Sequence, residues 1–264
     1  MESTNTPFST VLSQSPVAKE TVIKTNKLTK RFGDFIATNE MTFEVYRGEI
    51  FGFLGANGAG KTTGMKLLCG LSTPSSGEAT IAGFDIYLQT EKIKKNIGYM
   101  SQKFSLYEDL TIMENIHFYG GIYGLSNNQL KEKTGKLIDQ LGLTHEAKKL
   151  VGSLPLGWKQ KLAFSVAVLH EPKIVFLDEP TGGVDPVTRR QFWDLIYAAA
   201  DSGITIFVTT HYMDEAEYCD RISMMVDGVI KALGTPTDLK EQFSATSMDE
   251  VFFELARGTK RRAD

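Results

Sequence analysis

Nearly uninterrupted apolar runs stand out at three places along the chain, residues 50–54, 174–177 and 204–208. Runs of this length are too short for buried helices and are typical of strands covered on both faces, as parallel sheets require. In the second half of the chain such strands alternate with helical patterns, of which the clearest covers residues 192–199. Alternating strands and helices predict an α/β fold with a parallel or mixed sheet.

The chain before residue 101 is rich in short β patterns separated by glycine turns. We predict strands at Val22–Leu28, Phe35–Thr38, Thr42–Tyr46, Glu49–Leu54, Glu78–Ala82 and Ile97–Ser101. A single helical run, Thr63–Leu71, interrupts them, and Phe32-Gly33 is expected to form a turn. The pattern predicts an N-terminal antiparallel β subdomain.

Residues 105–170 change to helical spacing. Thr111 and Ser126 each stand three residues before a Glu or Gln, which is the spacing of a capping box at a helix start. A third pattern, Gly157–His170, is apolar almost all round, so this helix is expected to be deeply buried. The sequence therefore predicts a helical subdomain inserted after the β-rich part.

The C-terminal part is expected to contain a hairpin and a last helix. Asp227-Gly228 lies between two apolar runs, Ile222–Val226 and Val229–Leu233, and is typical of a tight hairpin turn. A capping box at Ser247–Glu250 is expected to begin the final amphipathic helix.

These patterns outline one folded domain over residues 21–257. Residues 1–20 are rich in Ser, Thr, Asn, Pro and Gln, a composition typical of a disordered tail, and they lack the basic start and apolar core of a signal peptide. Residues 258–264 are expected to form a second, flexible tail.

Composition and charge narrow the classes of function. Hydrophobic residues make up 42% of the chain and charged residues 23%, which is ordinary for a globular protein. The formal net charge of −3 gives no overall basic field, so nucleic acid is not expected as a partner. The longest apolar stretch, Leu162–Leu169, is too short to span a bilayer. Cys69 and Cys219 both fall in predicted helices and are expected to be reduced, buried thiols.

A glycine loop follows the first apolar strand: Gly55, Gly58 and Gly60 precede Lys61 and Thr62. Strand, glycine loop, Lys-Thr and helix form the P-loop pattern, in which inward-turned N–H groups and a helix N-terminus hold phosphates. Lys61 is expected to reach the β- and γ-phosphates of a nucleotide, and Thr62 to bind Mg²⁺. The bland alternative is a chance glycine turn, which the flanking strand and helix disfavour.

A second motif places Asp178 and Glu179 directly after an apolar strand. Ligands bind open α/β sheets at the carboxyl ends of their strands. Asp178 is therefore suited to hold Mg²⁺, and Glu179 to orient or deprotonate the attacking water. The alternative is a strand that simply ends in solvated acids, and the upstream P-loop disfavours this alternative.

Three further residues are weaker candidates. His211 follows the strand that should lie beside Asp178, where it could donate to a γ-phosphate oxygen, although a strand-end histidine is more often structural. Gln102 follows another strand and could touch both Mg²⁺ and the water. Phe32 precedes a glycine turn and could stack on a base, with a core aromatic as an even alternative.

In this order the motifs resemble the nucleotide-binding domain of an ABC transporter, over residues 20 to about 257. The resemblance rests on the P-loop, Gln102, Leu177-Asp178-Glu179-Pro180-Thr181, Gly182-Gly183-Val184-Asp185 and Thr210-His211. Three segments look like ATPase subunits of bacterial ABC-2-type exporters: Gly48–Gly55, Ser105–Thr111 and His211–Glu217. The run Leu154–Gln160 is similar to the second ATPase half of multidrug exporters of the YbhF type.

The resemblance implies an ABC ATPase domain over residues 21–257, with its helical subdomain at about 105–170, that binds ATP and Mg²⁺. The implied nucleotide contacts are Phe32, Gly55, Asn57, Gly58, Ala59, Gly60, Lys61, Thr62 and Thr63, with Pro155, Gly157 and Asp185 acting at a dimer interface. The implied catalytic residues are Glu179, His211, Gln102 and Lys61, and the implied metal ligands are Thr62, Gln102 and Asp178.

The resemblance also implies partners and a location. Two such domains, identical or different, bind head to tail around two ATP molecules and drive a separate membrane-spanning permease, near which Phe104–Tyr107 would lie. The expected location is the cytoplasmic face of the inner membrane, reached through the permease. A soluble ABC-type ATPase acting on nucleic acid or ribosomes is the alternative, and a non-hydrolysing, nucleotide-gated regulator is a third class.

One motif departs from the family pattern. The usual signature Leu-Ser-Gly-Gly-Gln reads Leu154-Pro155-Leu156-Gly157-Trp158 here. Pro155 has neither the serine hydroxyl nor an N–H, and Leu156 crowds a backbone approach that glycine would permit. Two hypotheses follow: a homodimer with a weakened signature, or pairing with a different ATPase whose normal signature completes this chain's site.

Overall fold

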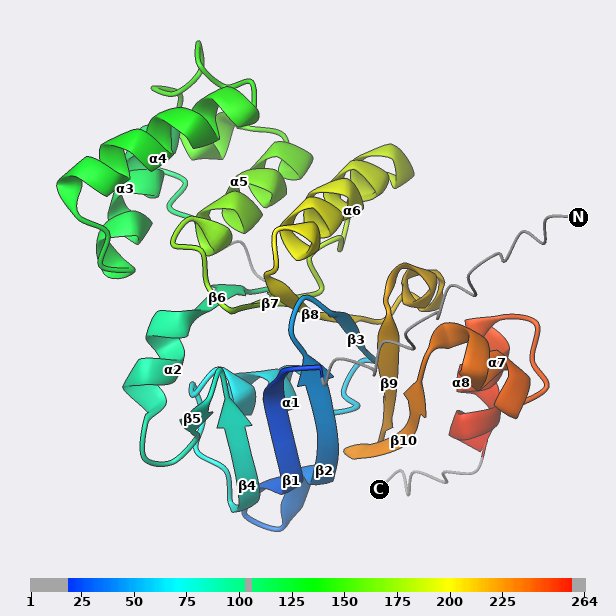
Figure 1. The fold of residues 1–264 in the computed structure, drawn as a ribbon. Helices are drawn as coiled ribbons and strands as arrows, with labels where there is room; N and C mark the ends of the chain where they lie inside the picture. Colours follow the sequence, from blue (N-terminus) through cyan, green and yellow to red (C-terminus); the bar gives the residue numbers. More distant parts are fainter. Residues whose placement is uncertain (1–18, 103–105, 258–264) are drawn as a thin grey trace, which may run out of the picture.

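The computed structural model describes residues 19–102 and 106–257. In Figure 1 a group of helices lies over one end of a central sheet, and a smaller sheet lies below it. The predicted tails at residues 1–20 and 258–264 lie outside the described residues, apart from Lys19 and Glu20. Glu20 is paired with Arg47, whose Nη1 lies 3.0 Å from its carboxylate.

Among the described residues, the larger sheet has six strands in the order β10-β9-β3-β8-β7-β6. In chain order they are β3 Ile50–Leu54, β6 Ile97–Met100, β7 Ile174–Asp178, β8 Thr205–Thr210, β9 Arg221–Val226 and β10 Val229–Gly234. Every neighbouring pair is parallel except β9–β10, the predicted hairpin. The predicted mixed sheet is confirmed, and β3, β7 and β8 end side by side at one edge.

The smaller sheet is antiparallel, as predicted, and has the strand order β2-β1-β4-β5. Its strands are β1 Thr21–Phe32, β2 Phe35–Tyr46, β4 Ser76–Ile81 and β5 Phe84–Asp85. Aromatic side chains join the two sheets: the ring of Phe43 in β2 stacks on Phe51 in β3 at 5.5 Å between centroids, and Phe51 stacks on Phe207 in β8 at 5.6 Å.

The apolar run of β3 has a simple physical cause. Phe51 and Phe53 face the aromatic cluster between the sheets, whereas Ile50 and Leu54 belong to the core under the helices. Successive side chains of a strand point to opposite faces, and here both faces are buried. A strand in this position cannot carry the alternating polar residues of a surface strand.

The described helices are α1 Lys61–Leu68, α2 Thr90–Asn96, α3 Ile112–Ile122, α4 Asn127–Gln140, α5 Leu156–Val168, α6 Pro186–Asp201, α7 Pro236–Gln242 and α8 Met248–Arg257, with 3₁₀ turns η1 Val151–Ser153 and η2 Met213–Tyr218. Both predicted capping boxes, at Thr111 and Ser126, are present. α3, α4 and α5 group together above the sheet in Figure 1. None of the helices over residues 19–102 and 106–257 combines the length and apolar character needed to cross a membrane.

Some predicted boundaries are wrong. α1 runs over Lys61–Leu68 rather than Thr63–Leu71, because Gly60 caps its start and Gly70, at φ +67, ends it. The two strands predicted at 35–38 and 42–46 form one strand, β2, which continues through an irregularity in the β1–β2 register. At this irregularity Glu40 adopts φ +50 and donates its backbone N–H to the Thr29 hydroxyl.

Two helices were missed. α2 carries mostly charged and polar residues around a single buried side chain, Ile93. Its sequence therefore lacks the helical spacing of apolar residues from which a helix is predicted. α7 begins at Thr235 and Pro236, and the Thr235 hydroxyl accepts from the backbone N–H of Asp238. This Thr-Pro start is a recognisable signal of a helix N-terminus in the sequence.

Predictions for two other features need correction. Cys219 follows η2 and Cys69 follows α1, so neither lies within a helix, although both are free and buried as predicted. At the start of α8, Glu250 accepts from the backbone N–H of Thr246 at 2.7 Å rather than from Ser247. Ser247 does accept from the N–H of Glu250, at 3.3 Å. One of the two predicted capping-box bonds is therefore present, and the other is made by Thr246 instead of Ser247.

Candidate functional site

The glycine loop between β3 and α1 is held tightly by its surroundings. Gly60 has φ +104, and a Cβ there would lie 2.3 Å from the carbonyl oxygen of Ala37 in β2. A Cβ on Gly55 would lie 2.4 Å from the carbonyl oxygen of Met225 in β9. These close approaches require glycine at both positions, so the spacing of Gly55 and Gly60 reflects the packing of the loop against β2 and β9.

Lys61 is the first residue of α1, and its ammonium group is buried in the loop. Nζ donates to the carbonyl oxygens of Gly55 and Ala56 at 2.8 and 3.2 Å, and it lies 3.5 Å from Glu179. Burial lowers the pKa of Lys61, and the nearby Glu179 carboxylate opposes that shift. The cation therefore stands between the glycine loop and Glu179, where it can also bind phosphate oxygens.

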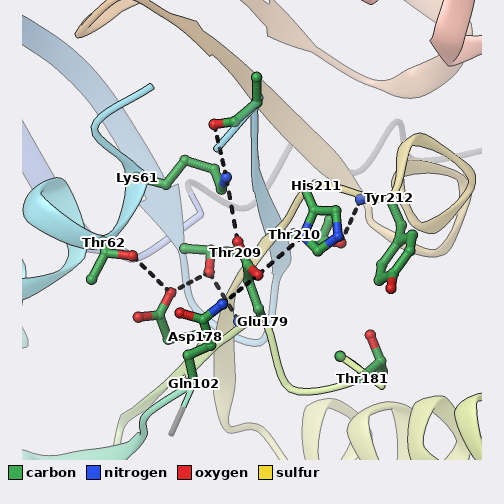
Figure 2. Close-up of polar contacts among 12 residues, drawn as sticks. Lys61, Thr62, Gln102, Asp178, Glu179, Thr181, Thr209, Thr210, His211 and Tyr212 are labelled. Carbon is green, nitrogen blue, oxygen red and sulfur yellow. Dashed lines mark hydrogen bonds and ion pairs between the residues drawn. The ribbon is translucent and has the colours of Figure 1, made fainter. Parts of the chain in front are cut away.

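Asp178 ends β7 and is joined to two hydroxyl groups (Figure 2). Its Oδ1 accepts from Thr209 at 2.7 Å and from Thr62 at 3.3 Å. Asp178 is 2% exposed, and burial raises the pKa of its carboxyl group, against the effect of these hydrogen bonds. This is a set of oxygen donors of the kind that Mg²⁺ prefers.

Three side chains from three elements converge on Glu179 (Figure 2). Its Oε2 accepts from Nε2 of Gln102 at 2.8 Å and lies 3.0 Å from Nδ1 of His211, a close contact without hydrogen-bond geometry. Its Oε1 faces the ammonium group of Lys61. The parallel order β8-β7-β6 brings these residues together at one edge, as predicted for His211 beside Asp178.

The backbone of Glu179 is strained. It has φ +49, a left-handed conformation that costs a non-glycine residue about 1–2 kcal/mol. Two bonds from its N–H to Thr209, to the carbonyl oxygen and to the hydroxyl, both at 3.1 Å, hold it there. Strain of this kind is retained where the fold over-determines it, and it turns the carboxylate toward the glycine loop.

An open cavity of about 420 Å³ lies over the glycine loop. Its lining is Phe35, Ala37, Asn57, Gly58, Gly60, Lys61, Thr62, Thr63, Gln102 and Glu179. Phe32 does not line it, and at 56% exposure it is not a core aromatic either. Phe35, which sequence reasoning missed, pairs with Phe32 across the β1–β2 turn, and this hairpin register is the signal that could have found it.

The residues predicted to act at a dimer interface, Pro155, Gly157 and Asp185, do not line this cavity, and neither do Gly55, Ala59, Asp178 and His211. Pro155 is the N-cap of α5 and makes no side-chain capping bond. Asp185 caps α6, accepting from two backbone N–H groups and from the Thr188 hydroxyl, and these bonds lower its pKa, the hydroxyl first. Gly157 packs on the same Thr188, where a Cβ would meet its methyl group at 2.4 Å.

A buried lysine after the glycine loop of β3, an Asp-Glu pair at the end of β7 and a histidine just after β8, the strand between them, define a P-loop nucleotide-binding domain. Residues 38–182 match the model of a family described as ABC transporter. The chain belongs to the ABC transporter family, as its motifs indicated.

Named relatives and solved structures agree with this assignment. The chain is 49% identical to the probable multidrug ABC transporter ATP-binding protein YbhF of Escherichia coli over 241 residues, 89% of this chain and 42% of that protein. It is 35% identical to the linearmycin resistance ATP-binding protein LnrL of Bacillus subtilis, over 89% of this chain and 79% of that protein. A solved structure of an ATP-binding subunit of an ABC transporter superposes with a TM-score of 0.80 at 29% identity, covering 89% and 99% of the two chains. The chain thus spans less than half of YbhF.

Proposed function

We propose that this chain hydrolyses ATP and that hydrolysis drives export of a substrate through a separate membrane-spanning permease. The observation that carries the proposal is the convergence of Lys61, Gln102 and His211 on Glu179, next to the Thr62–Asp178 pair. This arrangement holds a carboxylate base, a metal-binding acid and two phosphate-directed donors at one edge of a sheet.

The residues present fit ATP with Mg²⁺. The loop N–H groups and Lys61 would hold the phosphates, and the hydroxyl of Thr62 and the carboxylate of Asp178 would hold the metal ion, which there neutralises phosphate charge. Residues 19–102 and 106–257 contain no cluster of three or more His, Cys, Asp or Glu side chains that could hold a metal. A site with so few protein ligands suits Mg²⁺, which keeps waters and substrate phosphates.

Each catalytic residue then has a separate task. Glu179 orients and deprotonates the attacking water, and Gln102, which now donates to that carboxylate, can reach both the water and the metal. His211 donates to the γ-phosphate, where negative charge develops. The aromatic pair at the hairpin tip, Phe35 in the lining and Phe32 beside it, would stack on the adenine.

The nucleotide is expected to lie between two ATPase domains. Pro155, Gly157 and Asp185 lie off the cavity over the P-loop, on α5 and α6, so they are available to a second domain's ATP rather than to this chain's own. The second domain is either another copy or a different ATPase with a serine-containing signature. Vigorous turnover by the purified chain alone, rising with its concentration, would exclude the need for a different ATPase.

The names of the relatives support a transporter as the proposed partner. LnrL and YbhF are named as resistance and multidrug transporter ATP-binding proteins, which gives the nucleic-acid alternative no support. We place the chain at the cytoplasmic face of the inner membrane, bound to ABC-2-type permease subunits. Affinity purification from detergent-solubilised membranes tests this proposal. A polytopic membrane protein should co-purify in stoichiometric amount, and recovery of the chain without one would contradict it.

A further inference from the structure

A buried polar cluster lies behind the proposed catalytic residues and takes no part in the chemistry described above. Thr181 and Glu215 are both fully buried, and the Thr181 hydroxyl donates to Oε1 of Glu215 at 2.6 Å. Nε of Arg189, on α6, lies 3.7 Å from the same oxygen. Desolvating a carboxylate and a guanidinium group is costly, so a cluster of this kind needs an explanation.

The cluster reaches His211 on one side. The guanidinium group of Arg189 lies over the ring of Tyr212, with its Cζ 4.3 Å from the ring centroid. Tyr212 in turn packs on His211, with 4.2 Å between their ring centroids. The backbone N–H of Tyr212 donates to the hydroxyl of Thr210 at 3.0 Å, which fixes the segment after β8.

On the other side the cluster reaches Glu179. Thr181 lies in the turn that follows Glu179, and the N–H of Gly182 donates back to the Glu179 carbonyl oxygen at 3.1 Å. Figure 2 shows Thr181 below Tyr212 and away from Lys61. The backbone from Glu179 to Thr181 and these contacts therefore close a ring, which runs on through Glu215, Arg189, Tyr212 and His211 and returns to Glu179 at 3.0 Å.

We propose that Thr181, Glu215 and Arg189 are positioning residues that set the placement of His211 relative to Glu179. This inference rests on the proposed function, because it concerns the geometry of the same hydrolytic site. Two loops leave neighbouring strands at this edge, one after β7 and one after β8, and each carries one reacting group. Glu215 lies in η2, after β8, and its buried carboxyl group accepts from Thr181, after β7, which converts two separate turns into one rigid unit.

The cluster contains its own matched control. Asp214 also pairs with Arg189, at 3.4 Å from Nη1, but its side chain is 63% exposed. Exposed pairs contribute little, whereas a buried partner of the same guanidinium group cannot be replaced by water. Asp214→Asn should therefore change little, and Glu215→Gln, which removes the same charge one residue further on, should change much.

Two substitutions at Thr181 separate the hydroxyl from the shape of the side chain. Thr181→Val keeps the volume and removes the donor to Glu215, and Thr181→Ser keeps the donor. For ATP hydrolysis, Thr181→Val should lower kcat about tenfold, the loss expected for one buried hydrogen bond, with KM nearly unchanged. Glu215→Gln keeps an acceptor for Thr181 but removes the charge that faces Arg189, and it should lower kcat by a similar factor. Thr181→Ser and Asp214→Asn should retain kcat close to that of the parental chain.

A second readout does not depend on turnover. The ring proton resonance of His211, assigned with a His211→Asn variant, should shift in nucleotide-free Thr181→Val and Glu215→Gln and stay in place in Thr181→Ser and Asp214→Asn. If the parental chain hydrolyses ATP and all four variants keep its kcat and its His211 resonance, the positioning role is wrong. A fall in melting temperature with kcat and resonance unchanged would make the cluster purely structural and overturn the inference equally. If the parental chain shows no hydrolysis, the proposed function fails, and the resonance still decides the positioning role.

Discussion

Restoring the family signature is the perturbation that follows most directly from the departure at Pro155 and Leu156. In the double variant Pro155→Ser, Leu156→Gly, the serine hydroxyl could donate to the γ-phosphate of the ATP held by a second domain. Pro155 has φ −56 and ψ 150 at the N-cap of α5, a conformation that serine adopts readily there. The backbone therefore needs no rearrangement to accept the change.

The expected gain in rate exceeds the expected change in stability. A donor directed at developing charge contributes up to about 2.7–4 kcal/mol, or roughly 10²–10³ in kcat. A serine N-cap stabilises a helix by about 0.5–2 kcal/mol, and glycine in its first turn costs about 0.5–1 kcal/mol. Leu156 is 45% exposed, so its removal loses little buried surface. The two folding effects nearly cancel, and the rate effect should dominate.

The assay is steady-state ATP hydrolysis by the purified chain, with melting temperature measured in parallel. The matched control is Pro155→Ala, Leu156→Gly, which makes the same steric change without the hydroxyl. We expect kcat to rise at least tenfold over this control, a conservative part of the range for one donor. Equal rates for the two variants in an active homodimer would refute a catalytic role for the missing hydroxyl.

Three further predictions concern single residues. Burial lowers the pKa of His170 to about 4, below the value of about 6.5 in an unfolded chain, so stability should be lost as pH falls from 6.5 towards 4, by about 3 kcal/mol at most. Urea titrations should show this slope in the parental chain and a flatter one in His170→Gln; equal slopes would contradict it. Gly60→Ala should abolish ATP binding measured by calorimetry, because its Cβ would lie 2.3 Å from the Ala37 carbonyl oxygen, and parental affinity would show that the loop relaxes. Phe35→Ala should weaken ATP binding more than Phe32→Ala, by up to about 1–3 kcal/mol for a lost stacking contact. A larger loss of affinity in Phe32→Ala would indicate that Phe32, and not Phe35, stacks on the adenine.

The sequence predicted the placement of the candidate residues well where backbone geometry alone fixes it. The spacing of Gly60 and Lys61 is imposed by the loop itself, and Asp178 and His211 were found because strands of a parallel sheet end at one edge. The two capping boxes of the helical part were also predicted, since each is a local interaction between residues three apart.

What the sequence could not show depends on contacts between distant segments. The hydrogen bond from Thr181 to Glu215 joins residues 34 positions apart, and although both lie in segments that resemble the family, no local pattern indicates that they pair. Phe35 enters the cavity lining only because β1 and β2 pair in one particular register. α2 escaped prediction because it buries only Ile93, which leaves no apolar period.

The most direct test of the account is a comparison of parental and Glu179→Gln proteins, in whichever assembly the parental chain hydrolyses ATP. Glutamine keeps the shape and can still bond to Gln102, but it cannot take a proton from water. The account predicts that ATP binds with nearly unchanged affinity while its conversion to ADP falls by about 10²–10⁴. Conversion at the parental rate in the Glu179→Gln protein would contradict the central claim that this carboxylate is the catalytic base.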